Sequence, residues 1–130
     1  MSRATILGIV GINLGIFVLW RFPPAWRILN RYFIVTSGIV RPLAHLGNTF
    51  SHQSLRHLAG NMIVFYIVGT NLHEQMGRGD FLALYVSSGV IGSVVSLISM
   101  GLRGILISSS LGASGAVSGI FAAFCVINPE

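Results

Sequence analysis

The chain has 130 residues and a formal net charge of +5, with 53% hydrophobic and 8% charged residues. Soluble domains carry about 25% charged residues, so this composition excludes an ordinary soluble protein. It also excludes a disordered chain, because such chains are poor in hydrophobic residues. The basic excess does not indicate nucleic-acid binding, since the sequence has no run of arginines interleaved with aromatic residues. The sequence predicts an all-α fold, a polytopic membrane helix bundle.

The first apolar stretch covers residues 4–20, between Arg3 and Arg21. It reaches the lower limit of about 17 residues for a membrane span. We expect no cleavable targeting segment here, because arginine and proline follow the stretch in place of a small-residue cleavage site. The next segment, residues 21–56, contains three prolines and therefore cannot form one helix. Its aromatic residues suit a membrane interface, so we predict a structured interfacial loop.

Three further spans are predicted at residues 57–73, 81–102 and 112–128, and the helix of the last should begin near Ser114. Span 57–73 is the least hydrophobic, so its polar side chains should face the bundle interior. The short glycine-containing connection after it predicts a tight antiparallel pair with span 81–102. Small residues at four-residue spacing predict close helix packing: Gly11 and Gly15, then Ser88, Gly92 and Ser96, then Gly115 and Gly119.

Two groups of residues could carry chemistry. Ser114 lies beside glycine at a predicted helix start, where unpaired backbone N–H groups could bind an oxyanion. His57 and Asn61 are four residues apart, so they share a helix face and could donate hydrogen bonds to one developing charge. Each pattern also has a structural explanation, namely glycine-mediated packing for the first and a polar contact between helices for the second. Glu74 is interpreted as structural, with Arg78 as an available partner.

Three blocks of the sequence resemble the rhomboid family of intramembrane serine proteases. Residues 49–52 and 54–62 are similar to the family's signature of two histidines and an asparagine. Residues 69–89 resemble the turn between its second and third core helices, and residues 112–116 resemble its nucleophile motif. Within the family, residues 19–23, 31–33, 110–116 and 129–130 are most similar to the mitochondrial, presenilin-associated rhomboid-like branch. The resemblance extends over nearly the whole chain.

The resemblance implies a role for each matched residue. Ser114 would be the nucleophile, and His57 and Asn61 would help to form the oxyanion hole. Gly112 would let the substrate backbone approach, and His52 would support the site from the preceding loop. No metal or organic cofactor is implied, and the expected partners are transmembrane protein substrates and the lipid bilayer. Many bacterial members have a tyrosine four residues after the nucleophile, stacked on the catalytic histidine, whereas this chain has Ser118.

Residues 1–130 would form an incomplete rhomboid domain with about four of the six core helices. The family's catalytic histidine lies on its sixth core helix, and no histidine follows Ser114 in this sequence. We therefore expect an intramembrane serine endopeptidase whose first 130 residues are inactive by themselves. The alternative is a non-catalytic rhomboid-like membrane protein that binds transmembrane clients.

Localisation is expected to be integral to a membrane. The mitochondrial inner membrane is favoured over the bacterial plasma membrane, because arginines concentrate in residues 21–56. Cytoplasmic and matrix-facing loops carry the excess of basic residues in membrane proteins, and the mitochondrial branch turns this loop to the matrix.

Overall fold

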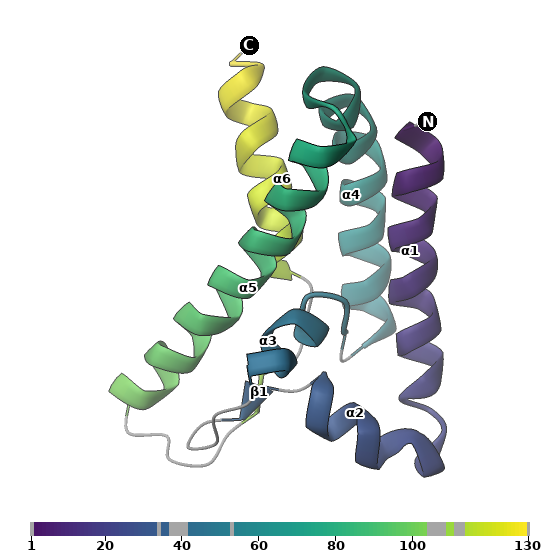
Figure 1. Ribbon diagram of the computed structural model, residues 1–130, viewed down its shortest axis with the longest axis vertical. Coiled ribbons are helices and arrows are strands. Elements are labelled where there is room, and N and C mark those ends of the chain that lie inside the picture. Colours follow the sequence, from purple (N-terminus) through teal and green to yellow (C-terminus); the bar gives the residue numbers. More distant parts are fainter. Residues whose placement is uncertain are drawn as a thin grey trace.

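The computed structural model describes residues 2–33, 35–36, 42–52, 54–103, 109–110 and 114–129. In chain order its elements are α1 (Ser2–Leu19), η1 (Pro23–Ala25), α2 (Trp26–Tyr32), β1 (Val35–Thr36), α3 (Pro42–Asn48), α4 (Leu55–Met76), α5 (Arg78–Leu102), β2 (Ser109–Ser110) and α6 (Ser114–Ile127). Helices α1, α4, α5 and α6 form a bundle, and the shorter elements gather at one end of it (Figure 1). The predicted all-α class is confirmed, with one two-residue strand pair added to it.

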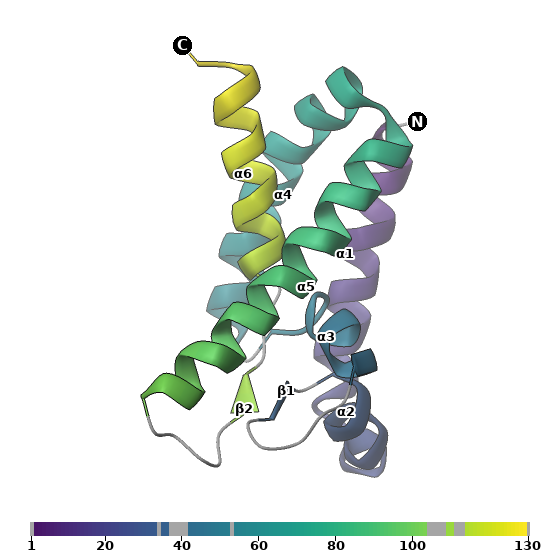
Figure 2. The same cartoon turned by 60° about the vertical axis from the view of Figure 1, so that its left-hand side comes forward.

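The segment between α1 and α4 is divided into short elements by its prolines. Pro23 begins η1, and Pro42 begins α3, the position in a helix where a missing N–H does no harm. Strand β1 pairs antiparallel with β2, matching Val35 with Ser110 and Thr36 with Ser109. Figure 2 shows the two strands side by side below the bundle. The interfacial segment is therefore hydrogen-bonded to the chain shortly before α6, a link that the sequence did not predict.

A single residue, Gly77, separates α4 from α5. Its φ of +87° is a left-handed conformation that glycine adopts without a Cβ clash, and its N–H donates to the His73 carbonyl at 2.9 Å. The predicted tight pairing of the two helices is therefore found at their connection. Close packing of the pair along its length is not found, because α6 packs against both α5 and α4 more extensively than those two helices pack against each other. Figures 1 and 2 show α5 diverging from α4 toward its C-terminal end.

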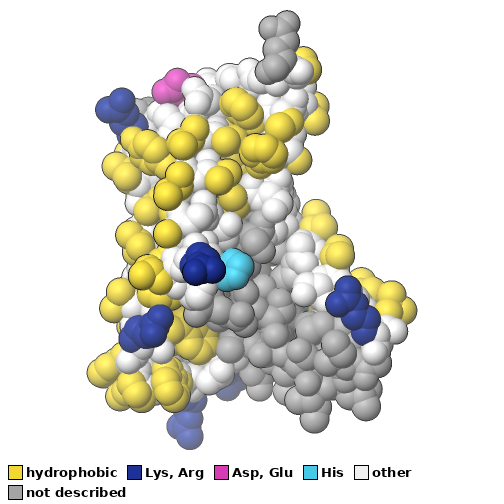
Figure 3. All heavy atoms as spheres, turned by 180° about the vertical axis from the view of Figure 1, so that it is seen from behind, with side chains coloured by type: hydrophobic (Ala, Val, Ile, Leu, Met, Phe, Trp, Pro, Cys, Tyr) yellow, Lys and Arg dark blue, Asp and Glu magenta, His cyan; other side chains and the backbone are white. Residues whose placement is uncertain are grey.

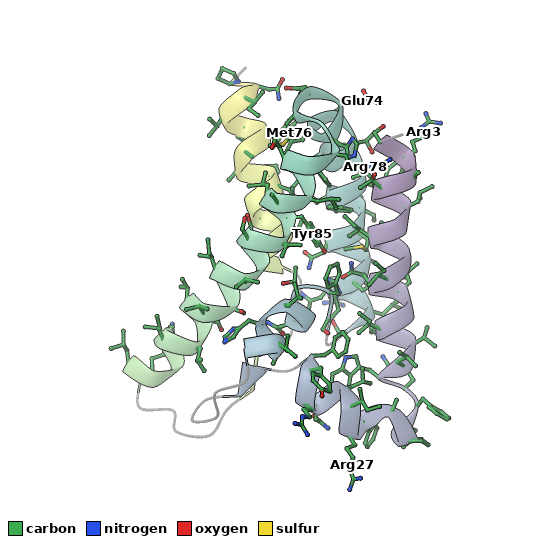
Figure 4. All side chains as sticks on the ribbon, viewed as in Figure 1. Arg3, Arg27, Glu74, Met76, Arg78 and Tyr85 are labelled. Atoms are coloured by element: carbon green, nitrogen blue, oxygen red, sulfur yellow. The ribbon has the colours of Figure 1, made fainter. Side chains whose placement is uncertain are left out.

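Charged side chains lie at both ends of the bundle, and most side chains between the two ends are apolar. Arg3, Glu74 and Arg78 are at one end, and Arg27 is at the other (Figure 4). Figure 3 shows a broad hydrophobic surface over the upper half of one face, with most of the visible basic side chains below it. Ser2–Leu19 and Arg78–Ser99 are long and apolar enough to cross a membrane, and Gly115–Ile127 is a shorter apolar helix. That α4 and α6 also span the membrane stays a prediction.

Small residues bring α5 and α6 into close contact. A Cβ added at Gly92 would lie 3.1 Å from the Gly115 Cα atom, and one added at Gly119 would overlap the Ser88 side chain. Small residues permit such an approach of two backbones. The predicted close packing is confirmed at Ser88, Gly92, Gly115 and Gly119. For Gly11 and Gly15 it is wrong in the described part of the chain, because a Cβ added at either would meet nothing within 4 Å.

We expect Gly119→Ala to destabilise the bundle by about 1–3 kcal/mol, because overpacking a close contact forces backbone shifts. The measurement is the thermal unfolding midpoint in detergent micelles. Gly11→Ala is the matched control, since its new methyl group meets no neighbour. Adding Ser88→Gly to Gly119→Ala should recover part of the loss, because it removes the overlapping side chain. Equal midpoints for the two alanine variants would contradict the close α5–α6 contact.

Candidate functional site

A hydrogen bond joins two of the residues singled out from the sequence. His52 lies in the turn that follows α3, and Asn61 is the seventh residue of α4. The Asn61 Nδ2 and His52 Nε2 atoms are 3.0 Å apart. With Asn61 as donor, Nε2 accepts and the neutral ring carries its proton on Nδ1. An asparagine amide nitrogen has two hydrogens, so His52 occupies one and leaves the second to point elsewhere.

His52 is held neutral by its surroundings. Its side chain is only 2% exposed. Burial, and to a lesser extent the positive charge that His57 can carry, lower its pKa from 6.5 to about 4. The His52 Nδ1 atom is buried and has no hydrogen-bond partner among the described residues. The ring therefore serves as a fixed acceptor for Asn61 at neutral pH.

His57 does not join this pair by a hydrogen bond. It lies in the first turn of α4 with its side chain exposed. Its backbone N–H donates to the Ser54 hydroxyl at 3.3 Å, which caps the helix. The predicted sharing of one helix face by His57 and Asn61 stands, because they are four residues apart on α4. The hydrogen-bond partner of Asn61, however, is His52, which comes from outside the helix.

An open cavity of about 330 Å³ lies between α4 and α6. Its lining consists of Asn61 and Val64 from α4 and Val117, Ser118 and Phe121 from α6. Ser118 and Phe121 follow Ser114 by four and seven residues, so position 114 begins the same stripe of the helix. Ser114 is the first residue of α6, as predicted. Its side chain, and the whole of Gly112, lie outside the described residues.

Glu74 has a structural partner, but a different one from the arginine considered in the sequence. The Ser2 hydroxyl donates to Glu74 Oε1 at 3.0 Å, joining the start of α1 to the end of α4. Within the described ranges, no group of three or more His, Cys, Asp or Glu residues could hold a metal ion. The polar side chains that line the cavity are the amide of Asn61 and the hydroxyl of Ser118.

The lowered pKa of His52 predicts a pH dependence of stability. The unfolded ring titrates near pH 6.5 and the folded ring near pH 4, so the unfolded state binds more protons between these values. The contribution of neutral His52 should be present above pH 6.5 and lost as pH falls to 4, on the order of 3 kcal/mol. Thermal unfolding midpoints in detergent at constant ionic strength measure it. His52→Gln, which cannot titrate, should reduce the fall of the unfolding midpoint between pH 6.5 and 4. A fall equal to that of the wild type would contradict the prediction.

The Rhomboid domain family matches residues 40–130 of the chain. The chain belongs to the rhomboid family. Rhomboid protein 1, mitochondrial, of Saccharomyces cerevisiae is 36% identical over 127 residues, covering 96% of this rhomboid chain and 37% of the relative. Presenilin-associated rhomboid-like protein, mitochondrial, of Homo sapiens is 38% identical over 132 residues, covering 99% of this chain and 34% of the relative. RHOMBOID-like protein 12, mitochondrial, of Arabidopsis thaliana is 32% identical over 99 residues, covering 75% of this chain and 30% of the relative.

These relatives confirm the expected branch and localisation, because each is named as a mitochondrial rhomboid protein. The rhomboid chain spans about a third of the length of the relatives that it matches. No solved structure matches it.

Proposed function

We propose that the protein is an intramembrane serine endopeptidase that cleaves membrane-spanning protein substrates. The observation that supports the proposal is the cavity between α4 and α6, which is lined by Asn61 and by Ser118 and Phe121 of the stripe of α6 that begins at position 114. A nucleophile at the start of one helix and an amide donor on a facing helix are the parts that acyl transfer needs. Membership of a family of serine proteases supports the same reading.

In the proposed reaction, the Ser114 hydroxyl attacks a peptide carbonyl of the substrate and forms a tetrahedral intermediate. The negative charge on its oxygen is stabilised by the second N–H of Asn61, by His57 and by backbone N–H groups at the start of α6. Collapse of the intermediate breaks the peptide bond and leaves an acyl-enzyme, which water then hydrolyses. His52 takes no part in bond making and acts by holding the Asn61 amide.

A base must accept the Ser114 proton and return it to the leaving amine. The family resemblance assigns this base to a histidine on the sixth core helix, which packs beside the residue four positions after the nucleophile. Here that residue is Ser118, and its small side chain lines the open cavity. We propose that the cavity receives the base-bearing helix of the full-length protein. Without a stacking tyrosine at position 118, that helix must be oriented by other contacts.

The test is covalent labelling of the full-length protein, embedded in liposomes, with a fluorophosphonate probe. Such probes phosphonylate only an activated serine, and mass spectrometry of the digested protein locates the adduct. We expect a single adduct on the peptide containing Ser114. An absent adduct in folded protein, or an adduct on another serine, would contradict the proposal and favour the non-catalytic binding of transmembrane clients.

A further inference from the structure

A buried polar cluster joins α1, α5 and the turn that follows α3. The Asn13 Nδ2 atom on α1 donates to the Ile9 carbonyl at 2.8 Å and to the Tyr85 hydroxyl on α5 at 3.4 Å. The Tyr85 hydroxyl in turn donates to the Thr49 carbonyl at 3.4 Å. Asn13, Thr49 and Tyr85 are each 0% exposed. Polar side chains in the interior of a membrane bundle are rare, are usually paired with one another and often have a function. This cluster is therefore a candidate for a functional role.

The turn contacted by Tyr85 is the one that carries His52. Residues 49–52 leave α3 through successive backbone turns and enter the bundle, where Thr49, Ser51 and His52 are buried. Tyr85 meets this turn with both parts of its side chain. Its hydroxyl bonds the Thr49 carbonyl, and its ring packs against Phe50 with centroids 5.6 Å apart. Figure 4 shows Tyr85 directed from α5 into the bundle.

Gly89 supports the same turn one helical turn further along α5. A Cβ added at Gly89 would overlap the Thr49 side chain, so this side chain rests directly on the α5 backbone. Residues 85 and 89 are four apart and share one face of the helix. The turn is thus fixed to α5 by a hydrogen bond, a ring contact and a close steric contact.

Another set of positions on α5 holds α6. Ser88 contacts Gly119, and Gly92 contacts Gly115, the residue next to Ser114. The same helix therefore fixes both the turn that bears His52 and the helix that begins at Ser114. A shift of the turn along α5 would move His52 relative to Asn61 on α4 and relative to α6.

We propose that Tyr85 and Gly89 are positioning residues of the candidate site, which hold residues 49–52 on α5 so that His52 keeps the Asn61 amide directed into the cavity beside α6. The inference rests on the proposed function. Neither residue lines the cavity. Their proposed effect on the reaction is therefore indirect, through His52 and the Asn61 amide.

The first test measures the turn without using activity. Diethyl pyrocarbonate modifies accessible imidazoles, and mass spectrometry of the full-length protein in detergent reports each histidine separately. His52 should be protected in wild type, while exposed His57 in the same sample gives the reference rate. Tyr85→Phe should raise His52 modification relative to His57 roughly three- to tenfold, the factor that a neutral hydrogen bond contributes to an equilibrium. Gly89→Ala should act in the same direction by displacing Thr49.

Each variant has a matched control elsewhere in the bundle. Tyr66→Phe removes a hydroxyl from an exposed tyrosine on α4, and Gly11→Ala adds a methyl group that meets nothing within 4 Å. Neither should change the protection of His52. If His52 in Tyr85→Phe and Gly89→Ala remains as protected as in wild type, the proposal is wrong, whatever the serine reactivity.

The second test asks whether the effect reaches Ser114 through His52. Tyr85→Phe should slow fluorophosphonate labelling of Ser114 by about tenfold, because small displacements of catalytic groups are costly. In a His52→Ala background the same substitution should have no further effect, since the two changes act through one path. Independent, multiplying effects would show that Tyr85 is merely structural and would overturn the proposal. If wild type gives no Ser114 adduct, the proposed function fails, and the protection of His52 alone decides the role of Tyr85.

Discussion

Replacing Ser114 with alanine should abolish proteolysis, with a loss of at least about 10³-fold in the rate of cleavage of a transmembrane substrate. The loss is large because Ser114 is the proposed nucleophile that forms the acyl-enzyme, and residual catalysis would rest on oxyanion stabilisation alone. The measurement is the initial rate of cleavage of a fluorescent transmembrane substrate by the full-length protein in liposomes. Substrate binding should be nearly unchanged, since the hydroxyl contributes little before it attacks.

Ser87→Ala provides the matched control for this experiment. Ser87 is an exposed serine on α5 whose hydroxyl donates to the Ala83 carbonyl of its own helix at 2.6 Å. Its loss should leave the cleavage rate within about twofold of wild type, because surface substitutions have small effects. Cleavage that survives in Ser114→Ala would exclude Ser114 as the nucleophile. Retained client binding with no cleavage in wild type would favour the non-catalytic alternative.

The breaks between helices were predictable because they depend on neighbouring residues. Gly77 ends α4 through its backbone conformation, and prolines 23 and 42 divide the interfacial segment. The packing partners of small residues were less predictable. Gly92 and Gly119 face α6 and α5 respectively, whereas Gly11 on α1 faces no neighbour in the described part of the chain. Four-residue spacing permits two helices to approach, but it does not specify whether a second helix is there.

In the candidate site, too, local features were predictable and long-range contacts were not. Spacing on one helix placed His57 and Asn61 on a common face, yet Asn61 is bonded to His52, from a turn outside that helix. This partner depends on how residues 49–52 enter the bundle. Along that path Thr49 contacts Tyr85 and Gly89, which lie more than thirty residues later in the chain. Strand β1 pairs with β2 over two residues, too few to produce a recognisable alternation in the sequence. Long-range contacts of this kind leave no local pattern.

Replacing Asn61 with alanine should lower the turnover number by about 10²–10³, the usual effect of removing one oxyanion donor. The Michaelis constant should change little, because the negative charge exists only in the transition state and the intermediate. Steady-state cleavage in liposomes separates the two parameters. His52→Ala should produce a smaller loss of the same type, since it removes the bond that orients the amide at 3.0 Å but leaves the amide in place.

Asn71→Ala distinguishes this effect from the loss of any asparagine on α4. Asn71 is exposed on the same helix, and its Nδ2 atom donates to the Ile67 carbonyl at 2.9 Å. Its replacement should leave both kinetic parameters near their wild-type values. If Asn61→Ala instead raises the Michaelis constant at an unchanged turnover number, Asn61 contributes to substrate binding, and the oxyanion charge must be stabilised by His57 and the backbone of α6. The direction in which the two parameters separate therefore assigns the chemical role of the amide, and with it the reason that His52 is kept buried and neutral beside it.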